Sequence, residues 1–432
     1  MRFYLETYGC SLNSSDSDVM EHILTTLGAT KVSSPDDADL ILVNTCGVKE
    51  PTEDKILSQL SRLGQLGPPV IVAGCLTRIS PARVRQAIPS FAALVPPDAI
   101  GLIEEVVGRV LTGERNLTEF AGTPSPKLEH IGYQGSSVIC TVPLCEGCLG
   151  ECTYCAVRLA RGRVRSNSID EICRAVERCI CHGCREIRLT AQDVGAFGHD
   201  TGESLIDLLS RIDMIRGAHV CRLGMFNVHL VQDFLPDLLE VVRSPHFFRF
   251  FHVPLQSGSD RLLELMGRPY TVAEWEWAVS TIRSTFPDAT IATDVIVGFP
   301  DESEQDFDMT YDLIRRVRPD VVNISKYGDR PGTVASRADH KVPTDTKKSR
   351  SRKLTRLALS ISEASNQALV GWCGPVIITE RGADSSSLGR TWSYRRIVLR
   401  EDISPGTVVN CRVVSASKTH LLGRLIQPGE RP

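Results

Sequence analysis

Short apolar runs alternate with helical patterns along most of the 432-residue chain, and this alternation restricts the fold more than any other feature. Three such runs open the sequence, and each ends in a cysteine: RFYLETYGC at Cys10, DLILVNTC at Cys46 and VIVAGC at Cys75. Strand–helix alternation predicts a parallel sheet, whose strands all end at one shared edge. The sequence therefore predicts that three distant cysteines gather on one rim, which favours a metal site over core packing.

The helical patterns between these runs have clear ends. DSDVMEHILTTLG is predicted to begin with Asp16 as its N-cap. A second helix is predicted over about 50–66, and SPARVRQAI places Pro81 directly after the cap Ser80. These signals predict an open parallel α/β domain over residues 1–112.

A second alternating series follows residues 113–135, which are rich in turn formers and are predicted to be a linker. Its first helix carries a capping box from Ser168 to Glu171. The strands are predicted in SVICTVPL, EIRLTAQD, VCRLGMFN, FRFFHVPLQ, TIATDVIVGF and VVNISKYG, with helices near 168–183, 203–216, 231–242, 273–286 and 303–317. Six such units are typical of a partial or complete barrel, whose chemistry lies at the carboxyl ends of its strands.

The last part of the chain has a different pattern. The basic segment KVPTDTKKSRSRKLTR, residues 341–356, leads into a helix predicted near 350–369. Beyond it, short strands separated by turn formers predict a small antiparallel barrel of the oligonucleotide-binding type. The predicted fold class is thus α/β, with the amino-terminal domain, a (βα)6-type partial TIM barrel at 136–368 and the small β-barrel at 369–432.

The net charge of −3 conceals an asymmetry between the two ends of the chain. Residues 341–432 contain 16 Lys and Arg against 7 Asp and Glu, a net charge of +9, so residues 1–340 carry −12. A basic end on an acidic body favours a polyanion such as nucleic acid as partner, although a solvated basic face is the alternative.

The amino terminus lacks the profile of a secretory signal, and no apolar run nears the ~18–20 residues that span a bilayer. A cytoplasmic protein without a membrane partner is therefore expected. Because cytoplasmic thiols stay reduced, the 15 cysteines are interpreted as metal ligands, catalytic groups or core residues rather than disulfides.

The stretch CEGCLGECTYCAVRLARG contains four closely spaced cysteines. Cys148, Cys152 and Cys155 form C-x3-C-x2-C directly after the first strand of the predicted barrel. Three thiolates on such a loop can ligate three irons of a 4Fe–4S cluster and leave the fourth iron open. The alternative is a closed site with four thiolates that includes Cys145. Cys140 and Cys145 lie in an apolar strand region, so both are expected to pack in the core.

This spacing, with Tyr154 just before the third cysteine, resembles the radical S-adenosylmethionine (SAM) superfamily. The resemblance implies that the open iron binds the amino and carboxylate groups of SAM, and that reductive cleavage of this cofactor gives a 5′-deoxyadenosyl radical.

A closer resemblance covers nearly the whole chain. TYGCSLNSSDS, NTCGVKE and AGCL resemble the amino-terminal domain of the methylthiotransferases. ECTYCAVRLARGRVRS, LTAQDVGAFG, HVPLQSGSDRLLELMGRPYT, TDVIVGFPDESEQDF and VNISKYGDRPGT resemble their radical core, and about sixty carboxyl-terminal residues resemble the RNA-binding TRAM domain. CLGECTYCAVRLARG, LTAQD and NISKYGDRPGT are most similar to the archaeal and eukaryotic branch, which acts on N6-threonylcarbamoyladenosine at position 37 of tRNA.

This resemblance implies methylthiolation of C2 of that nucleoside and a second 4Fe–4S cluster held by Cys10, Cys46 and Cys75, whose open iron carries sulfur. C2 of adenine is an unactivated C–H carbon, so cofactors must supply the difficult step. The implied partners are the tRNA anticodon loop, an electron donor and a sulfur source. No catalytic residue beyond the cluster ligands is implied.

Several further residues match the family motifs or end predicted strands. Gln192 and Asp193 end the second barrel strand, where cofactor polar groups are met, although capping by Asp193 is an equal alternative. Asp294 and the turn GFPDE resemble a cofactor-binding motif, in which the family more often has glycine at Asp301. The cofactor-binding residues implied in this way are Tyr154, Gln192, Asp193 and Asp294.

Substrate contacts are expected from two regions. Arg268 and Tyr270 match the family motif M-x-R-x-Y-T and are interpreted as substrate-positioning residues. The barrel mixes aromatic and basic side chains, as single-strand binders do, although edge-strand charges are the alternative. The substrate-binding residues expected there are Trp392, Arg395, Arg396 and Lys418. Of the arginines that follow the cysteine loop, three of the four are expected in solvent: Arg158, Arg161, Arg163 and Arg165.

Four cysteines lie near one another in the first helix of the second series. Cys173 and Cys179 fall on its apolar face and are expected in the core, whereas Cys181 and Cys184 fall off that face. A third metal centre is therefore not expected.

Three other functions stay open at this stage. One is a methylthiotransferase that acts on isopentenyladenosine in tRNA, and another is a methylthiotransferase that acts on an aspartate of a ribosomal protein. The third is a non-catalytic iron–sulfur protein that binds RNA.

Overall fold

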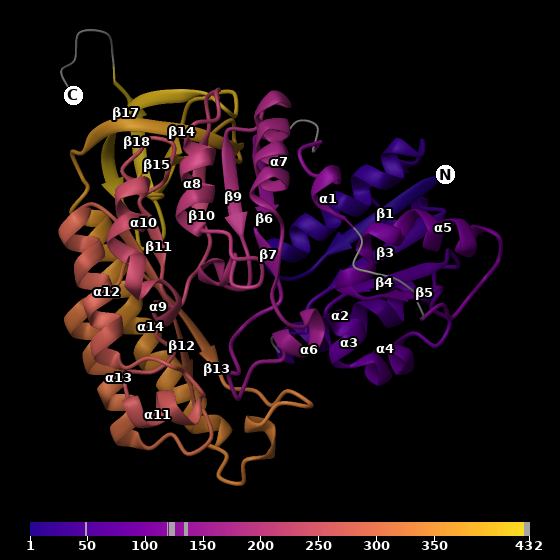
Figure 1. Cartoon of the computed structure of the whole chain (residues 1–432), viewed down its shortest axis with the longest axis horizontal. Coiled ribbons are helices and arrows are strands. Elements are labelled where there is room, and N and C mark those ends of the chain that lie inside the picture. Colours follow the sequence, from indigo (N-terminus) through magenta and orange to yellow (C-terminus); the bar gives the residue numbers. More distant parts are fainter. Residues whose placement is uncertain (48–49, 119, 121–125, 134–136, 427–432) are drawn as a thin grey trace.

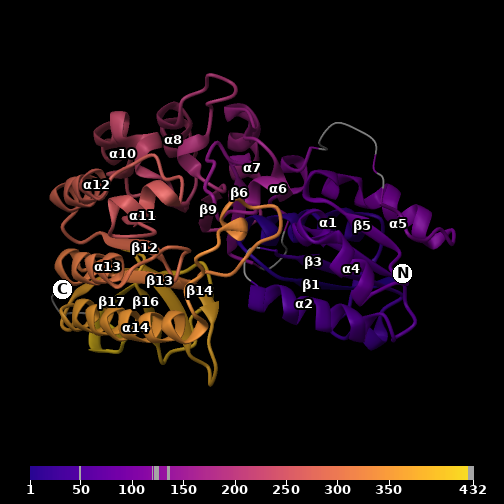
Figure 2. The ribbon, with the colours of Figure 1, turned by 90° about the horizontal axis from the view of Figure 1, so that it is seen from below.

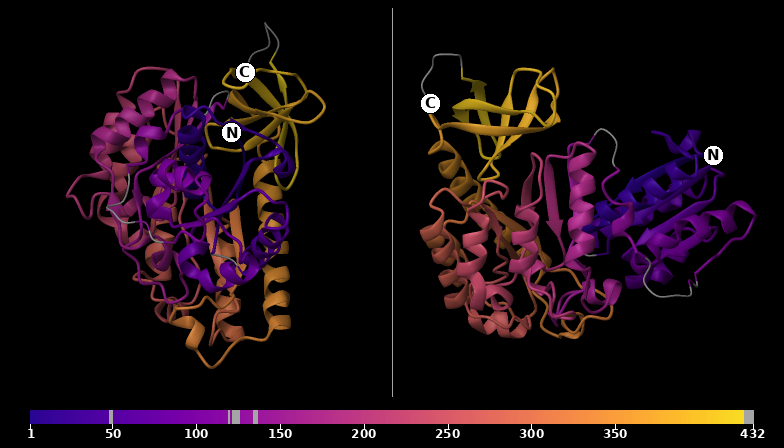
Figure 3. Two further views of the ribbon diagram at one scale, coloured as in Figure 1. Left: turned by 90° about the vertical axis from the view of Figure 1, so that its right-hand side faces the viewer. Right: turned by 45° about the horizontal axis from the view of Figure 1, so that its top comes forward.

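The computed structural model describes residues 1–47, 50–118, 120, 126–133 and 137–426, and it has three parts (Figure 1). The amino-terminal part lies beside the central part, as a second view also shows (Figure 2). The carboxyl-terminal barrel packs against one end of the central part (Figure 3). Among the described helices, none is long and apolar enough to cross a bilayer.

The amino-terminal sheet is parallel throughout, with strands in the order β2-β1-β3-β4-β5. The buried apolar runs form its central strands, so the predicted open α/β architecture is confirmed. The strands are β1 (Arg2–Thr7), β2 (Thr30–Lys31), β3 (Leu40–Thr45), β4 (Val70–Gly74) and β5 (Ala93–Val95). The helices are α1 (Ser11–Thr26), α2 (Glu50–Leu63), α3 (Leu76–Ile79), α4 (Pro81–Ala87) and α5 (Ile103–Leu111).

Helix α1 begins earlier than predicted, because its N-cap is Cys10 and not Asp16. Asp16 lies inside the helix, where its buried side chain pairs with Lys127 and Arg161. These partners are 111 and 145 positions away in the chain, so a local sequence pattern could not distinguish this buried carboxylate from a cap.

The central part contains the six predicted strands, all in parallel pairings. They form two sheets, β10-β9-β6 and β11-β12-β13, and backbone hydrogen bonds from Cys221 to His246 and Phe248 join the two halves. The strands are β6 (Ile139–Pro143), β9 (Glu186–Thr190), β10 (Val220–Leu223), β11 (Phe250–His252), β12 (Thr290–Val297) and β13 (Val321–Lys326). The predicted partial barrel is therefore confirmed.

Helices cover the outside of this partial barrel (Figure 2). The capping box from Ser168 to Glu171 is present at the start of the first long helix. The helices are α6 (Val157–Arg161), α7 (Ile169–Cys181), α8 (Leu205–Asp213), α9 (Val228–Val231), α10 (Leu235–Val242), α11 (Asp260–Leu265), α12 (Val272–Thr285) and α13 (Glu304–Val317), and a short hairpin pairs β7 (Cys145–Glu146) with β8 (Arg165–Ser166).

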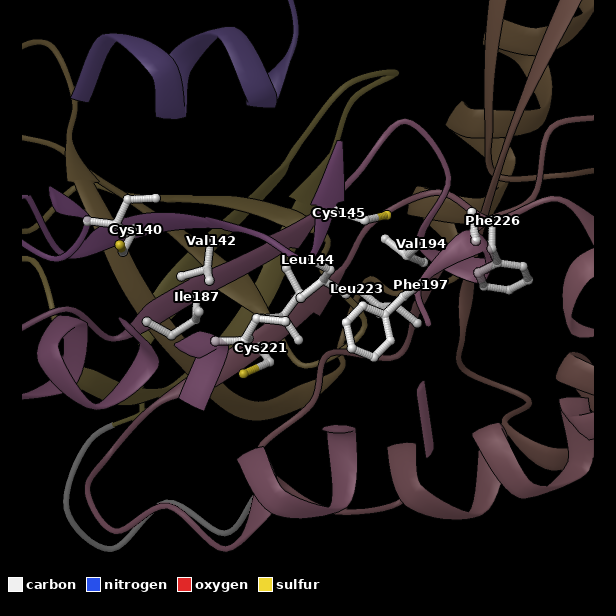
Figure 4. Packing of buried hydrophobic residues seen from close by; sticks show 14 of the residues in the cluster. Cys140, Val142, Leu144, Cys145, Ile187, Val194, Phe197, Cys221, Leu223 and Phe226 are labelled. Atoms are coloured by element: carbon white, nitrogen blue, oxygen red, sulfur yellow. The ribbon is translucent and has the colours of Figure 1, made fainter. Parts of the chain in front are cut away.

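Buried apolar side chains from β6, β9 and β10 fill the adjoining core (Figure 4). Cys140 and Cys145 lie among them, as the apolar strand pattern predicted. Both residues are at most 1% exposed, which agrees with a packing role.

The last part begins with helix α14 (Thr344–Gln367), which starts earlier than predicted and contains most of the basic segment 341–356. The barrel after it is closed, and one of its pairings, β16 with β18, is parallel rather than antiparallel. Its strands are β14 (Cys373–Arg381), β15 (Ser387–Thr391), β16 (Arg396–Leu399), β17 (Val408–Ala416) and β18 (Leu421–Leu425).

The predicted linker, residues 113–135, lies partly outside the described residues, at 119, 121–125 and 134–136. Its described residues include Leu117, which pairs through its backbone with Ala92 and Leu94, and the buried Lys127. The division of the chain into domains at this segment stays a prediction.

Candidate active site

The three cysteines that end the first apolar runs meet at the carboxyl edge of the amino-terminal sheet. Cys10, Cys46 and Cys75 follow β1, β3 and β4, which are adjacent strands. The Sγ atoms of Cys10 and Cys75 lie 3.7 and 3.8 Å from one atom, Oδ1 of Asn13. Burial, with a smaller contribution from the neighbouring thiols Cys10 and Cys46, raises the pKa of Cys75 to about 11. The predicted rim of cysteines is therefore formed by this sheet.

Two glycines allow these strand ends to approach one another. Gly9 precedes Cys10 with a φ of +124°, and a Cβ at this position would lie 3.0 Å from the Cβ of Cys46. Gly74 precedes Cys75 with a φ of +90°, and a Cβ there would lie 2.6 Å from the carbonyl oxygen of Thr45. Both positions need glycine, because an added side chain would fill the space in which the cysteines converge.

Each cysteine of the C-x3-C-x2-C loop receives one N–H donor. The backbone N–H of Gly150 donates to Sγ of Cys148 at 3.3 Å, and that of Val157 donates to Sγ of Cys155 at 3.4 Å. Nη1 of Arg268 donates to Sγ of Cys152 at 3.1 Å. Donors of this kind stabilise thiolates and tune the potential of iron–sulfur centres, so the loop fits a cluster chemically.

The spacing of the sulfur atoms distinguishes a cubane from a single zinc ion. With Zn–S bonds of about 2.3 Å, two thiolates on one zinc lie at most about 4.6 Å apart. Among the described residues, the one group of three or more potential ligands with all ligand atoms within 4.8 Å is Cys140, Cys179 and Cys184. Neither predicted triplet is that compact, and a cubane does not require such close sulfur atoms, because its thiolates bind separate irons.

Cys145, the possible fourth ligand of a closed site, is fully buried in the short strand β7. Its Sγ lies 3.8 Å from the backbone oxygen of Asp193, and burial raises its pKa. This placement favours the loop with three ligands.

A chain of hydrogen bonds connects the end of β9 to the cysteine loop. Asp193 accepts the backbone N–H of Gly195 at 3.0 Å and the side-chain amide of Asn227, so its capping role is confirmed. Asn227 accepts from Arg268, which also contacts Cys152. Burial raises the pKa of Asp193 to about 6, although the hydrogen bonds from Asn227 act to lower it. Sequence reasoning missed Asn227, since no motif distinguished it from other asparagines.

The other residues expected to bind the cofactor lie around the same loop or on the facing strands. Oε1 of Gln192 accepts the backbone N–H of Gly147 at 2.9 Å, next to Cys148. Tyr154 packs edge-on against Phe299, with ring centroids 6.3 Å apart. Their role in cofactor binding stays a prediction.

Asp294 on β12 joins two neighbouring strands through its carboxylate. Its oxygens lie 2.9 Å from Nε2 of His252 on β11 and 2.9 Å from Nδ2 of Asn323 on β13. In the turn that follows β12, Asp301 has a φ of +63°, a conformation that glycine adopts without strain, which agrees with the more usual glycine of the family.

The two residues of the M-x-R-x-Y-T motif have different surroundings. Arg268 lies at the cysteine loop, whereas Tyr270 is 5% exposed and its hydroxyl donates to the carbonyl oxygens of Pro254 and Leu255. Nε of Arg268 donates to the same hydroxyl at 3.0 Å. Tyr270 therefore holds Arg268 in place, and contact of either residue with substrate stays a prediction.

Helices α3 and α6, which begin just after Cys75 and Cys155, lie side by side (Figure 1). Cys75 and Ile79 share one small apolar cluster with Ala156 and Ala160, which follow Cys155. The rim of the amino-terminal sheet is thus packed directly against the segment that leaves the C-x3-C-x2-C loop. This contact joins the segments that carry the two triplets, although Cys75 and Cys148, their nearest members in the sequence, are 73 positions apart.

Cys140 and Cys179 form a disulfide across β6 and α7, with Cα atoms 6.4 Å apart. The expectation that no cysteine forms a disulfide is therefore wrong for this pair. The core position of Cys179 was predicted, but its partner in β6 was not, because their proximity arises from packing of the helix on the strand.

The expected substrate residues of the barrel fall into two groups. Trp392 donates from Nε1 to the carbonyl oxygen of Pro245, and Arg395 pairs with Asp320 at 2.6 Å, so both join the barrel to the central part. Arg396 and Lys418 are exposed. Contact of these residues with nucleic acid stays a prediction. The exposed Arg396 and Lys418 are better suited to it than Trp392 and Arg395, which pack against the central part.

Replacing Arg395 with alanine is expected to lower the free energy of unfolding by about 3–5 kcal/mol, because Asp320 would stay buried without its charged partner. The matched variant Arg396→Ala removes an exposed arginine at the next position and should change stability by less than about 0.5 kcal/mol. Urea unfolding of both variants measures the difference, and equal stabilities would contradict the docking role of Arg395.

Two family descriptions match the chain. Residues 2–96 match the "Uncharacterized protein family UPF0004", and residues 142–314 match the "Radical SAM superfamily". The first covers the cysteine rim and the second covers the C-x3-C-x2-C loop.

Similar proteins cover almost the full length of the chain. A probable threonylcarbamoyladenosine tRNA methylthiotransferase of Archaeoglobus fulgidus is 38% identical over 98% of this chain and 99% of its own. The threonylcarbamoyladenosine tRNA methylthiotransferase of Drosophila melanogaster is 33% identical over 98% of this chain and 78% of its own. A tRNA-2-methylthio-N(6)-dimethylallyladenosine synthase of Thermodesulfovibrio yellowstonii is 28% identical over 98% of both chains.

Among solved structures, the radical S-adenosylmethionine methyltransferase TsrM of Kitasatospora setae has a TM-score of 0.57 and 14% identity. The match covers 78% of this chain and 76% of that one, and it shows a shared fold.

Proposed function

Because the chain belongs to the threonylcarbamoyladenosine tRNA methylthiotransferase family of radical SAM enzymes, we propose that it methylthiolates C2 of N6-threonylcarbamoyladenosine at position 37 of tRNA. The product is 2-methylthio-N6-threonylcarbamoyladenosine. The observation that carries this function is the placement of two separate cysteine triplets on facing elements of a chain that matches this family from end to end.

We assign one 4Fe–4S cluster to Cys148, Cys152 and Cys155, and an auxiliary 4Fe–4S cluster to Cys10, Cys46 and Cys75. When bound, the clusters and S-adenosylmethionine supply a hydrogen-abstracting radical and the inserted sulfur, which an acid–base pair could not deliver to an unactivated carbon. Three protein thiolates at each site leave one iron of each cluster available to a further ligand.

The protein's own residues hold the reacting groups in place. Arg268, fixed by Asn227 and Tyr270, donates to a thiolate of the first cluster, at the carboxyl end of the partial barrel. We assign the binding of the SAM polar groups to the neighbouring side chains at the strand ends, namely Tyr154, Gln192, Asp193 and Asp294. Apolar side chains of α3 and α6 pack against each other between the two cysteine segments.

We place the tRNA on the basic carboxyl-terminal region, with the anticodon loop directed to the two cysteine triplets. Unpaired bases are accessible to protein side chains, which favours a loop as the target. The exposed Arg396 and Lys418 of the barrel are suited to phosphate contacts. The reaction also needs an electron donor and a sulfur source, and we place it in the cytoplasm.

The division of labour follows the three parts of the structure. We assign the auxiliary cluster to residues 1–112, the radical chemistry to 136–368 and RNA binding to 369–432, with 113–135 as the connection. Each of the two matched family regions falls within one of the first two assignments.

Mass spectrometry of nucleosides tests this function. Reconstituted enzyme, reductant, SAM and a sulfide source are incubated with tRNA that carries N6-threonylcarbamoyladenosine, and methylthiolation should convert that nucleoside. Conversion of isopentenyladenosine alone, or of a ribosomal-protein aspartate alone, would assign the enzyme to another branch. Absence of 5′-deoxyadenosine would instead indicate a non-catalytic iron–sulfur protein.

A further inference from the structure

Arg161 differs from the other arginines that follow the cysteine loop. It ends helix α6, six positions after Cys155, and its side chain is 1% exposed. Arg158, by contrast, forms a partly exposed ion pair with Glu151, and Arg163 is exposed. The expectation that three of these four arginines are in solvent is therefore met by Arg163 alone, since Arg158 and Arg165 are half-buried and Arg161 is buried.

The guanidinium of Arg161 reaches from the central part into the amino-terminal part. Nη2 donates to Oδ2 of Asp16 at 2.6 Å and to Oδ1 of Asn13 at 3.1 Å. The same oxygen of Asn13 lies 3.7 Å from Sγ of Cys10 and 3.8 Å from Sγ of Cys75. Arg161 follows the loop of one cysteine triplet, and Cys10 and Cys75 belong to the other. All three side chains therefore contact the same atom, Oδ1 of Asn13.

Asn13 is itself held firmly. It is fully buried, and its Nδ2 donates to the carbonyl oxygens of Tyr8 at 2.9 Å and Thr45 at 2.8 Å, on two strands of the rim. Its Oδ1 therefore points in a defined direction, which fixes Arg161 relative to the two sulfur atoms.

The charges around Arg161 already balance before any cluster is considered. Arg161 and Lys127 bind the carboxylates of Asp16 and Glu146, which makes a buried network of two cations and two anions. Thiolates at the rim would add negative charge beside it, and a buried charge needs a nearby counter-charge. Among the cations of this network, Arg161 is the one that donates to Asn13, beside Cys10 and Cys75.

One N–H of Arg161 has no partner within the described structure. Its Nε is buried and makes no hydrogen bond, whereas Nη1 donates to Glu146 and Nη2 donates to Asp16 and Asn13. An unpaired donor at this position costs free energy unless an acceptor is present. A negatively charged group at the rim would supply the missing acceptor.

We propose that Arg161 is a positioning residue for the auxiliary cluster, in that its guanidinium stabilises the negative charge of that cluster and ties it to the loop of the other. This inference rests on the proposed function. Nearby positive charge favours the reduced form, so Arg161 should raise the reduction potential of the auxiliary cluster.

A redox titration of the auxiliary cluster tests this role without measuring activity. The protein is the full chain with Cys148, Cys152 and Cys155 changed to alanine, so that only the auxiliary cluster gives a signal in electron paramagnetic resonance. Arg161→Gln is expected to lower the equilibrium constant for one-electron reduction about tenfold, equivalent to about 59 mV. Arg161→Lys keeps the charge and should restore most of the difference.

Lys127→Gln is the matched control, because it removes a partner from the same two carboxylates but does not contact Asn13. It should destabilise the protein while it leaves the midpoint potential unchanged. If Arg161→Gln does not assemble a cluster, the midpoint potential of Arg161→Lys is compared with that of the parent protein instead. Loss of auxiliary iron in both Arg161 variants but not in Lys127→Gln would also support the role.

An unchanged potential in Arg161→Gln, or an equal shift in Lys127→Gln, would overturn the inference. Failure of the two-cluster assignment on which the proposed function depends looks different, since the parent protein would then contain no auxiliary cluster to titrate, and a different substrate would leave the inference unaffected. The two outcomes are separated by the iron content and the resonance signal of the parent protein.

Discussion

Replacing Cys152 with alanine is expected to abolish the formation of 5′-deoxyadenosine from SAM. Cys152 is one of only three thiolates assigned to the first cluster, and Arg268 donates directly to its sulfur atom. Loss of this ligand should leave the loop unable to hold its cubane, so the iron content should fall from about eight to about four per chain. Anaerobic reconstitution, iron and sulfide analysis and chromatography of the SAM products measure both effects.

Cys145→Ala is the control for this variant, because Cys145 lies three positions before Cys148 but is buried in the core. It should retain about eight irons and SAM cleavage, with a loss of stability of about 1 kcal/mol, typical of single substitutions. Loss of iron and of cleavage in Cys145→Ala would instead indicate the closed site with four thiolates.

Replacing Cys46 with alanine is expected to stop methylthiolation while SAM cleavage continues. Cys46 belongs to the amino-terminal rim, and the loop that carries Cys148, Cys152 and Cys155 is a separate element with its own N–H donors. The variant should therefore keep about four irons and still form 5′-deoxyadenosine. Nucleoside mass spectrometry and SAM product analysis on the same sample separate the two activities.

Cys181→Ala serves as the control, since Cys181 is an exposed cysteine that belongs to neither triplet. It should match the unmodified protein in iron content, cleavage and methylthiolation. If Cys46→Ala lost SAM cleavage together with methylthiolation, the two centres would not be separable, and the assignment of one cluster to each triplet would be wrong.

The cysteines of the candidate site could be predicted because each carries a local signal. Cys10, Cys46 and Cys75 end apolar runs, and parallel strands share one edge, so the rim follows from the periodicity. The spacing of Cys148, Cys152 and Cys155 is itself the signal for the loop. The capping box at Ser168 and the six barrel strands were predicted for the same reason, since their residues lie close together in the chain.

The polar environment of those cysteines could not be predicted in the same way. Asn227 and Arg268 are 41 positions apart and meet only through the packing of the barrel, whose strand ends converge at Cys152. The position of Arg395 could not be predicted for the same reason. Its sequence neighbours suggest an RNA-binding surface, whereas its ion pair with Asp320 places it at the interface between the barrel and the central part.

The sequence by itself determined the alternation of strands and helices in the first two parts and the two sets of cysteines, because periodicity and spacing are properties of neighbouring residues, and its motifs indicated the family. The tertiary structure alone decided which charged groups are buried, as with Asp16 and Arg161. A charge can leave water only where a distant partner and a closed pocket compensate its desolvation, and both arise from the folded chain as a whole.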